Sequence, residues 1–496
     1  MYKEKNPYDL TIEEAAEGLA AKAFTSLELT QACLDRIKAY DKALNCFVTI
    51  EAELALKMAA ESDARRRAGE VRGLLDGIPY ALKDVYATKE SVATASSHIL
   101  ENWHPPYNAT VYQRLSDAGA VLLGKTNTDE FTMGSSTETS YFGVTRNPWD
   151  PTRVAGGSSG GPAAGVAAGF GIFGIGTDTG GSIRQPSAFC GVVGLKPTYG
   201  RVSRFGEIAM ASSLDQTGPI TRTVRDAAII LQVLAGQDPL DATSSDIPAD
   251  NYLEACTTSL KGVTLGVPTE FFGEGVRPEV EALVRTAIDE VKKLGATVKE
   301  VSLPTAGYSL AAYYIIAPAE VSSNMSRYDG IRYGYSVERE EQHEQHSLYD
   351  IYAKSRARGL GSEVKRRIML GNHVLSSGYY DAYYTKAEKV RTLVRNEFDT
   401  IFTEVDALLA PVSPHTAFPV GEKVNDPLAM YKEDILTVPG NIGGVPAISI
   451  PCGFVDGLPV GLQCIGKRFN EKMLFAIGSA YQSVTNYHLE KPNILS

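Results

Sequence analysis

The sequence predicts an α/β protein in which helices cover both faces of a β-sheet. The main observation is that, from Gly77 onward, short apolar segments alternate with segments of helical periodicity. The second is the composition, since 44% hydrophobic and 22% charged residues in a chain of 496 are sufficient for a full buried core. The expected core strands are residues 78–82, 121–123, 263–267, 407–409 and 447–450, and the expected helices between them include residues 110–118, 224–234 and 278–294.

Two regions are expected to be helical. In residues 9–70, Thr11 with Glu14 and Thr25 with Glu28 fit capping boxes, in which a hydroxyl and a carboxylate satisfy free backbone N–H groups at a helix start. Residues 310–400 are rich in tyrosine and charge and have long helical periodicity. We therefore divide the chain into an N-terminal helical region packed on the core (1–70), the first part of the core with the glycine–serine motifs (71–309), a helical insertion or substrate-side lobe (310–400) and the C-terminal part of the core (401–496).

The charge and the cysteine pattern exclude several classes of protein. A net charge of -11 argues against nucleic-acid binding over a broad surface, so such contacts are expected mainly on another chain. The six cysteines have no CxxC motif and no regular spacing, which favours reduced, mostly buried thiols over a disulfide framework or a zinc site. No apolar signal segment follows the first residues, and no run of apolar residues is long enough to span a membrane. We expect a cytoplasmic protein with no membrane contact and no metal of its own.

The most informative segment is dense in glycine and serine. Eleven glycines fall between Gly156 and Gly181, with serine clusters in residues 156–161 and 178–184. Glycine permits tight bends, positive φ angles and close approach of backbone to a ligand. Serine hydroxyls among free backbone N–H groups are what nucleophilic attack on a carbonyl requires. A flexible linker is the alternative, but apolar residues such as Ile172 and Phe189 in this segment argue against it.

Three motifs match known sequence patterns, but the segments or residues around them are not those that the patterns require. Residues 119–126 fit the Walker A pattern, but the preceding segment is helical and the middle of the motif is an apolar, strand-like run. Residues 169–174 fit GxGxxG, yet they follow a helical run. Residues 156–160 fit the GxSxG nucleophile elbow, which requires a later Asp and His, and no later histidine lies in a distinctive context. Nucleotide binding and a Ser-His-Asp triad therefore remain minor alternatives.

Lys83 is the better candidate for a base. It ends the apolar strand that begins near Gly77, and desolvation of a lysine amine lowers its pKa and makes the neutral form available. From spacing alone, a salt bridge from Lys83 to the adjacent Asp84 or another acid is the more usual arrangement, and it stays open as the alternative.

Residues 77–84, 156–169 and 177–197 resemble the three characteristic blocks of the amidase signature family. The resemblance covers nearly the whole chain and implies a large mixed β-sheet core covered by helices on both faces. It also implies a Ser-Ser-Lys catalytic set with Ser182 as nucleophile, Ser158 as bridging serine in an unusual cis peptide bond, and Lys83 as base. The backbone N–H groups of the preceding loop are expected to hold the oxyanion, and they belong to Thr179, Gly180 and Gly181.

Within this family, several stretches are similar to the glutaminase subunits of tRNA-dependent amidotransferases, namely residues 142–150, 312–320, 327–330, 363–371 and 378–381. The similarity implies that ammonia from glutamine passes to partner subunits B and C of a heterotrimer. These would convert Glu-tRNA(Gln) or Asp-tRNA(Asn) to the amidated form. ATP and Mg²⁺ would be used by a partner, charged tRNA would be bound mainly there, and this chain would need no cofactor.

The similarity also implies a pocket for free glutamine. Arg367 would bind the α-carboxylate and Asp434 the α-ammonium group, with Tyr313 assisting. Arg366 is an open alternative to Arg367, and both fit a helix surface as well. The sequence departs from the usual pattern of these subunits at residues 91–97 and at Gly440, so details of the pocket or channel can differ. A stand-alone amidase acting on other small amides, a catalytically silent scaffold and a nucleotide-binding protein remain as alternative functions.

Overall fold

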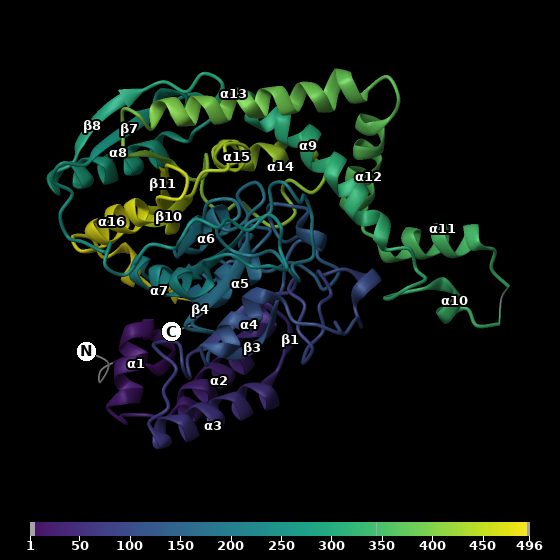
Figure 1. Ribbon diagram of the computed structural model, residues 1–496, viewed down its shortest axis with the longest axis horizontal. Helices are drawn as coiled ribbons and strands as arrows, with labels where there is room; N and C mark the ends of the chain where they lie inside the picture. Colours follow the sequence, from purple (N-terminus) through teal and green to yellow (C-terminus); the bar gives the residue numbers. More distant parts are fainter. Residues whose placement is uncertain (1–4, 344, 494–496) are drawn as a thin grey trace.

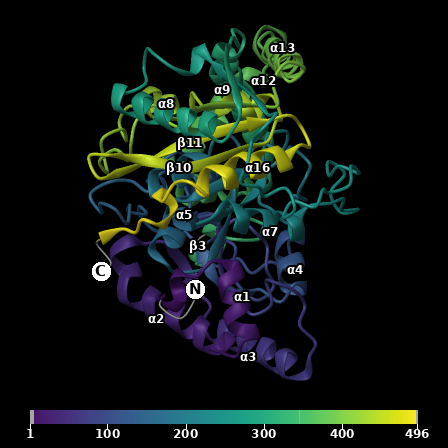
Figure 2. The same ribbon diagram turned by 90° about the vertical axis from the view of Figure 1, so that its left-hand side faces the viewer.

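The computed structural model describes residues 5–343 and 345–493, and one large sheet runs through the part of the chain that it describes (Figure 1, Figure 2). Its order is β1-β3-β2-β4-β6-β5-β10-β11-β9-β7-β8. The eleven strands are β1 (Phe47–Ile50), β2 (Pro79–Lys83), β3 (Val121–Thr126), β4 (Phe173–Thr177), β5 (Val193–Lys196), β6 (Thr217–Thr221), β7 (Thr264–Pro268), β8 (Thr297–Val301), β9 (Ala407–Pro411), β10 (Ala447–Val455) and β11 (Leu458–Gly466).

The sheet is mixed, as the family resemblance implies. Strand β2 runs parallel to both β3 and β4, and β7 runs parallel to both β8 and β9. The other neighbouring strands are antiparallel. Since parallel strands end at the same edge of a sheet, the last residues of β2 and β4, Lys83 and Thr177, come close together there.

Helices cover both faces of the sheet. Strand β11 is buried along its length; a Cβ added to Gly461 would meet Ala188 of α6, and one added to Gly466 would meet Leu474 of α16. Because these two positions differ in parity along one strand, α6 and α16 lie on opposite faces. The helices are α1 (Ile12–Ala20), α2 (Ser26–Leu44), α3 (Ala52–Ala68), α4 (Thr110–Asp117), α5 (Gly160–Ala168), α6 (Arg184–Cys190), α7 (Val224–Leu234), α8 (Pro278–Lys293), α9 (Ser309–Asn324), α10 (Val337–Glu340), α11 (Leu348–Gly359), α12 (Ser362–Leu375), α13 (Thr385–Ile401), α14 (Pro427–Tyr431), α15 (Val438–Ile442) and α16 (Glu471–Gln482).

The expected core elements are confirmed. The five predicted strands correspond to β2, β3, β7, β9 and β10, and the three predicted helices to α4, α7 and α8. Both capping boxes are present, with Thr11 and Thr25 each accepting the N–H of the glutamate three residues later. The α/β class therefore follows from the alternation of apolar and helical segments.

Two expectations need correction or extension. The N-terminal region is not helical throughout, because Phe47–Ile50 forms β1 and pairs with β3 at the sheet edge. The sheet also contains β4, β5, β6, β8 and β11, which were not predicted from the sequence. Residues 310–400 form α9 to α13, and Figure 1 shows α10 and α11 projecting from the body. The proposed boundaries at residues 70, 309 and 400 stay predictions.

All six cysteines are free thiols, and five of them are buried, as the spacing predicts. Among the described residues no helix is long and apolar enough to cross a membrane. Over the same residues there is no group of three or more His, Cys, Asp or Glu side chains that could hold a metal ion. Residues 1–4, where a signal segment was not expected, lie outside the described residues.

Candidate active site

Lys83 lies at the end of β2, a strand whose residues are all buried. Its Nζ atom donates to the hydroxyls of Ser158 at 2.7 Å, Ser159 at 2.9 Å and Thr177 at 2.8 Å. The neighbouring carboxylate of Asp84 instead accepts from the N–H and hydroxyl of Thr94. The alternative of a Lys83–Asp84 salt bridge is therefore wrong, and the amine is held by three neutral hydroxyls.

Burial lowers the pKa of Lys83 from 10.5 to about 7, because the charged amine loses its hydration. The carboxylates of Asp129, Glu207, Asp178 and Asp215 oppose this change by attracting the positive form. A substantial fraction of the amine is thus neutral at neutral pH. A neutral amine in contact with a serine hydroxyl is able to accept its proton.

Ser158 follows a cis peptide bond between Gly157 and Ser158, as the family resemblance implies. Gly157 has no room for a side chain, because an added Cβ would collide with the carboxylate of Asp129 and the backbone of Ser136. The next residue, Ser159, donates its N–H to the carbonyl of Ser182 at 3.0 Å. This contact joins the two serine clusters predicted from the sequence.

Ser182 lies in the loop between β4 and α6, and a buried ion pair holds that loop. Arg184 donates from Nε and Nη2 to the two oxygens of Asp178, at 2.9 and 3.0 Å. Burial alone would raise the pKa of Asp178, but Arg184 lowers it to about 2, so this carboxylate stays charged. No hydrogen bond to the Ser182 hydroxyl occurs among the described residues, which leaves it available to a substrate.

The loop before Ser182 presents free backbone donors. In the described part of the chain, the N–H groups of Thr179, Gly180 and Gly181 donate to no protein acceptor. The loop is fixed from the other side, where the hydroxyl of Thr437 donates to the Gly180 carbonyl at 2.6 Å. Gly181 has φ +145° and packs against Thr437, so any side chain there would be strained and would collide. Three fixed, unpaired N–H groups beside a free serine form an arrangement suited to an oxyanion.

Tyr313 and Asp434, the other two residues expected to bind the substrate, lie beside this loop. The Tyr313 ring covers Gly180, whose added Cβ would lie 2.9 Å from the phenol oxygen. One oxygen of Asp434 accepts from Ser135 at 2.9 Å and from Tyr314 at 3.3 Å. Burial raises the pKa of Asp434 to about 7, partly offset by the Ser135 hydrogen bond and Arg367.

Arg367, rather than Arg366, faces inward. The Arg367 side chain is 4% exposed and that of Arg366 is 43% exposed. Arg367 donates from Nε to Glu363 at 2.8 Å and lies beside the stacked rings of Tyr314 and Tyr431. Among the described residues its two terminal nitrogens donate to no acceptor, so both are available to a planar carboxylate. A cavity of about 270 Å³ adjoins both arginines.

The competing motifs do not form sites. The Walker-like residues 119–126 include β3 itself, and Lys125 is buried and donates to the Tyr86 carbonyl at 2.6 Å. A P-loop instead follows a strand and exposes its lysine to phosphate. No histidine in the described part of the chain hydrogen-bonds to Ser158 or Ser182. Nucleotide binding at this motif and a Ser-His-Asp triad are both wrong.

Several residues around Lys83 were not found from the sequence. Asp129, which is buried, and Glu207, which is partly buried, lie near Lys83, and Glu207 also faces Asp215. Burial and the repulsion from Asp215 raise the pKa of Glu207. Thr177 binds the amine directly through its hydroxyl. Only the three-dimensional fold brings these isolated acids together, and no local sequence signal marks them.

Comparison with known proteins shows the family to which the chain belongs. The sequence profile described as Amidase matches residues 28–475. The chain belongs to the amidase family. This confirms the resemblance to the amidase signature family and makes the protein an amidase signature enzyme.

The relatives of this amidase are similar over their full length. It is 54% identical to the glutamyl-tRNA(Gln) amidotransferase A subunit of Chloroflexus aggregans over 485 residues, covering 98% of each protein. It is also 54% identical to the protein of the same name from Moorella thermoacetica, covering 98% of this chain and 99% of the relative. The crystal structure of the Thermotoga maritima protein of that name has a TM-score of 0.82 at 40% identity and 99% coverage of both chains. The peptide amidase of Stenotrophomonas maltophilia has a TM-score of 0.83 at 32% identity and 99% coverage of both chains.

Proposed function

We propose that this amidase is the glutamine-hydrolysing subunit of a tRNA-dependent amidotransferase. The observation that best supports amide hydrolysis is the buried Lys83 amine, which contacts the Ser158 hydroxyl at 2.7 Å and has a pKa of about 7. The full-length similarity to amidotransferase A subunits supports the assignment of the substrate and the assembly.

In the proposed mechanism, Ser182 attacks the side-chain amide carbon of glutamine. Its proton passes to Ser158 and from there to neutral Lys83, and the carbonyl electrons move to the oxygen. The N–H groups of Thr179, Gly180 and Gly181 stabilise that oxyanion, and loss of one such donor typically slows turnover about 10²- to 10³-fold. The tetrahedral intermediate collapses when its C–N bond breaks and the same relay protonates the leaving nitrogen, which departs as ammonia. Water then hydrolyses the acyl ester of Ser182, with Lys83 again accepting a proton.

The charges at the far end of the pocket support free glutamine as the substrate. Arg367 has two unpaired terminal nitrogens for the α-carboxylate. Asp434 uses one oxygen for Ser135 and Tyr314, so the second oxygen is available to the α-ammonium group. Tyr313 covers Gly180, beside the N–H groups proposed to bind the reacting amide.

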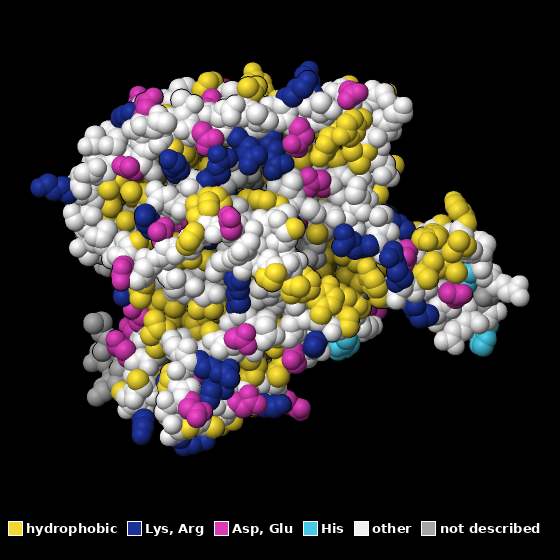
Figure 3. Space-filling model, viewed as in Figure 1, with side chains coloured by type: hydrophobic (Ala, Val, Ile, Leu, Met, Phe, Trp, Pro, Cys, Tyr) yellow, Lys and Arg dark blue, Asp and Glu magenta, His cyan; other side chains and the backbone are white. Residues whose placement is uncertain are grey.

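The partner part of the proposal is a heterotrimer with subunits B and C. These would receive the ammonia and use ATP and Mg²⁺ to amidate Glu-tRNA(Gln) or Asp-tRNA(Asn), so this chain would need no cofactor and would act in the cytoplasm. The net charge of -11 supports tRNA binding mainly by a partner. Figure 3 shows acidic and basic side chains interspersed over one face, and apolar side chains gathered where α12 meets α13. That exposed apolar cluster supports a protein partner, and it consists of Met369, Leu370, Tyr379, Tyr380 and Tyr383.

The test is ammonia release from glutamine by the tagged chain, isolated with the proteins that co-purify, beside Ser182→Ala. Release that depends on Ser182 and rises with two partner chains, ATP and charged tRNA is the expected result. Release from other amides by the lone chain, with glutamine ignored, would instead make the protein a stand-alone amidase. The likeness to a peptide amidase keeps that second function open.

A further inference from the structure

The loop with the free N–H groups, residues 178–181, is held by a segment that the proposed mechanism does not use. Asp215 is 2% exposed, and its Oδ1 atom accepts the hydroxyl of Thr179 at 2.7 Å. The carbonyl of the next residue, Gln216, accepts the N–H of Asp178 at 2.8 Å. Two consecutive residues of one segment therefore hold two consecutive residues of the loop.

The Asp215 carboxylate is itself fixed, because it closes a turn of residues 210–215. Its Oδ2 atom accepts the N–H of Met210 at 3.0 Å, and both of its oxygens lie 3.1 Å from the N–H nitrogen of Ala211. The carboxylate cannot rotate without breaking these contacts as well as the one with Thr179. The position of its Oδ1 atom is therefore determined by the backbone of the turn.

Two helices hold the turn in place from outside. Asn324, the last residue of α9, donates from its side chain to the carbonyl of Met210 at 3.0 Å. Arg391 of α13 donates to the hydroxyl of Ser213 at 2.8 Å and to the carbonyl of the same residue at 2.7 Å. The turn is thus connected to the body of the protein at both of its ends and is a rigid support for the loop.

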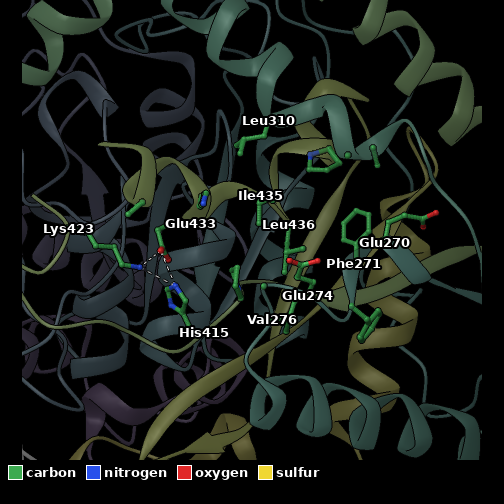
Figure 4. Close-up of a pocket in the computed structure, with 18 residues that line it drawn as sticks. Glu270, Phe271, Glu274, Val276, Leu310, His415, Lys423, Glu433, Ile435 and Leu436 are labelled. Carbon is green, nitrogen blue, oxygen red and sulfur yellow. Dashed lines mark hydrogen bonds and ion pairs between the residues drawn. The ribbon is translucent and has the colours of Figure 1, made fainter. Parts of the chain in front are cut away.

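The other anchor of the loop, Thr437, belongs to a segment with less packing behind it. Ile435 and Leu436 line a cavity of about 330 Å³, which Figure 4 shows. The Ile435 side chain is also exposed. Side chains that border a cavity lack contacts on that side and are held less firmly than those of a packed core. Of the two anchors, the one at Asp215 has the firmer support.

Asp215 also holds most of the negative charge of an acid pair. Burial raises the pKa of Asp215, and the guanidinium of Arg204 opposes this change. Burial and the repulsion from Asp215 raise the pKa of Glu207 above that of Asp215. The charge of the pair therefore lies mainly on Asp215. A hydroxyl donates more strongly to a charged carboxylate than to a neutral acceptor, so the bond from Thr179 is one of the stronger kind.

We propose that Asp215 is a positioning residue for amide hydrolysis, which fixes the N–H donors of the oxyanion loop through the hydroxyl of Thr179. The inference rests on the oxyanion role that the proposed mechanism gives to this loop. Asp215 holds the side chain of Thr179 while the N–H of the same residue stays free for the substrate oxygen. Donors that are already oriented stabilise the transition state more than the bound substrate, so loss of the anchor should lower kcat and leave KM nearly unchanged.

Two substitutions of Thr179 separate its hydroxyl from the rest of its side chain. Thr179→Val keeps the branched shape and the backbone N–H but removes the hydroxyl, whereas Thr179→Ser keeps the hydroxyl. With a slow, uncharged amide as substrate, we expect Thr179→Val to lower kcat about tenfold or more, with KM nearly unchanged. Thr179→Ser should retain most of the kcat. A normal kcat in Thr179→Val, or equal losses in the two variants, would overturn the proposal.

A double-mutant cycle tests whether Asp215 acts through Thr179. Asp215→Asn keeps the shape of the side chain and removes its charge, and it should lower kcat while leaving KM nearly unchanged. Adding Thr179→Val should cause little further loss, because both changes break the same contact. Losses that multiply in the double variant would show that Asp215 acts by another route, and the proposal would be wrong.

Asp238→Asn is the matched control for Asp215→Asn. Asp238 is 6% exposed and likewise accepts two side-chain hydroxyls and a backbone N–H, those of Thr110, Ser203 and Leu240. In the described part of the chain none of these residues hydrogen-bonds to the oxyanion loop. Asp238→Asn should lower the melting temperature but leave kcat unchanged. A loss of kcat equal to that of Asp215→Asn would show that the loss reflects stability alone, and it would overturn the proposal.

The remaining comparisons keep the proposal decidable. If Asp215→Asn fails to fold, the two Thr179 variants still decide the question. The amide assay does not require glutamine, so a chain that ignores glutamine still gives a result. If Gly181→Ala left kcat unchanged, the oxyanion role of the whole loop would be wrong. If Gly181→Ala lowered kcat and Thr179→Val did not, only the positioning role of Asp215 would be wrong.

Discussion

Replacing Lys83 by methionine is the most direct test of the catalytic centre. Lys83→Met keeps the length and most of the volume of the side chain but removes the only amine that contacts Ser158 among the described residues. The side chain is fully buried, so a shorter substitution would also create a cavity and confuse chemistry with stability. We expect the variant to fold and to lose nearly all turnover.

The expected loss of turnover in Lys83→Met follows from the pKa of Lys83. With a pKa of about 7, roughly half of the Lys83 amines are neutral at pH 7. A lysine with the ordinary value of 10.5 would be neutral in about one molecule in 3000 at that pH. Loss of a positioned general base usually slows a reaction about 10²- to 10⁴-fold. Because Lys83 acts on both acylation and deacylation in the proposed mechanism, we expect a loss toward the upper part of this range.

The assay is the pH dependence of Ser182 acylation with an uncharged amide, so that substrate ionisation does not contribute. In the native protein the rate should rise with pH as Lys83 loses its proton and level off above about pH 7. In Lys83→Met this rise should vanish. Lys125→Met is the matched control, because Lys125 is also a buried lysine near the end of a neighbouring strand, with a pKa lowered by burial to about 8. An unchanged inflection near pH 7 in Lys83→Met, or most of the turnover retained, would show that another group is the base.

Four further substitutions test the rest of the site. Ser182→Ala should abolish ammonia release while leaving the melting temperature unchanged, and residual turnover would exclude it as the nucleophile. Gly181→Ala introduces a Cβ at φ +145° and against a threonine side chain, so kcat should fall about 10²-fold or more, and a normal kcat would exclude this loop as the oxyanion hole. Asp434→Asn should raise the KM for glutamine and remove the rise in KM below about pH 7, where protonation neutralises the carboxylate; an amide without an ammonium group should be unaffected. Arg184→Met leaves the buried Asp178 charge unpaired and should lower the free energy of unfolding by about 3–5 kcal/mol in urea titrations.

Sequence reasoning succeeded where a signal is local. The apolar run before Lys83 predicts β2, and the periodicity of residues 224–234 predicts α7. It failed for β4, because glycines at alternate positions of Phe173–Thr177 weaken the strand pattern, and for β8, whose residues are partly exposed and polar. Both strands are formed because neighbouring strands pair with them, which is a property of the whole sheet.

The same distinction applies to the site. Lys83, Ser158 and Ser182 lie in dense motifs, so their chemical roles can be predicted from the sequence alone. The acids that oppose the lowered pKa of Lys83, such as Asp129 and Glu207, are single residues in ordinary contexts. Their effect depends on distance through a buried region, and distances between remote segments are not encoded locally.

The site is divided between two kinds of structure, and this division has a consequence for specificity. Lys83 ends β2, Ser182 lies in the loop after β4, and Ser158 lies just before α5. The two strands lie inside the sheet, and the loop after β4 is fixed by the buried pair of Asp178 and Arg184. The charges proposed to bind the far end of the substrate, those of Arg367 and Asp434, come instead from α12 and the 432–437 segment, which lie outside the strands. Changes in these outer elements can therefore alter the substrate while the reacting groups stay in place. The hydroxyl of Thr437 is the exception, because it connects the outer segment to the Gly180 carbonyl. A shift of the outer segment through that contact would affect kcat as well as KM, whereas a shift of Arg367 alone would affect only KM.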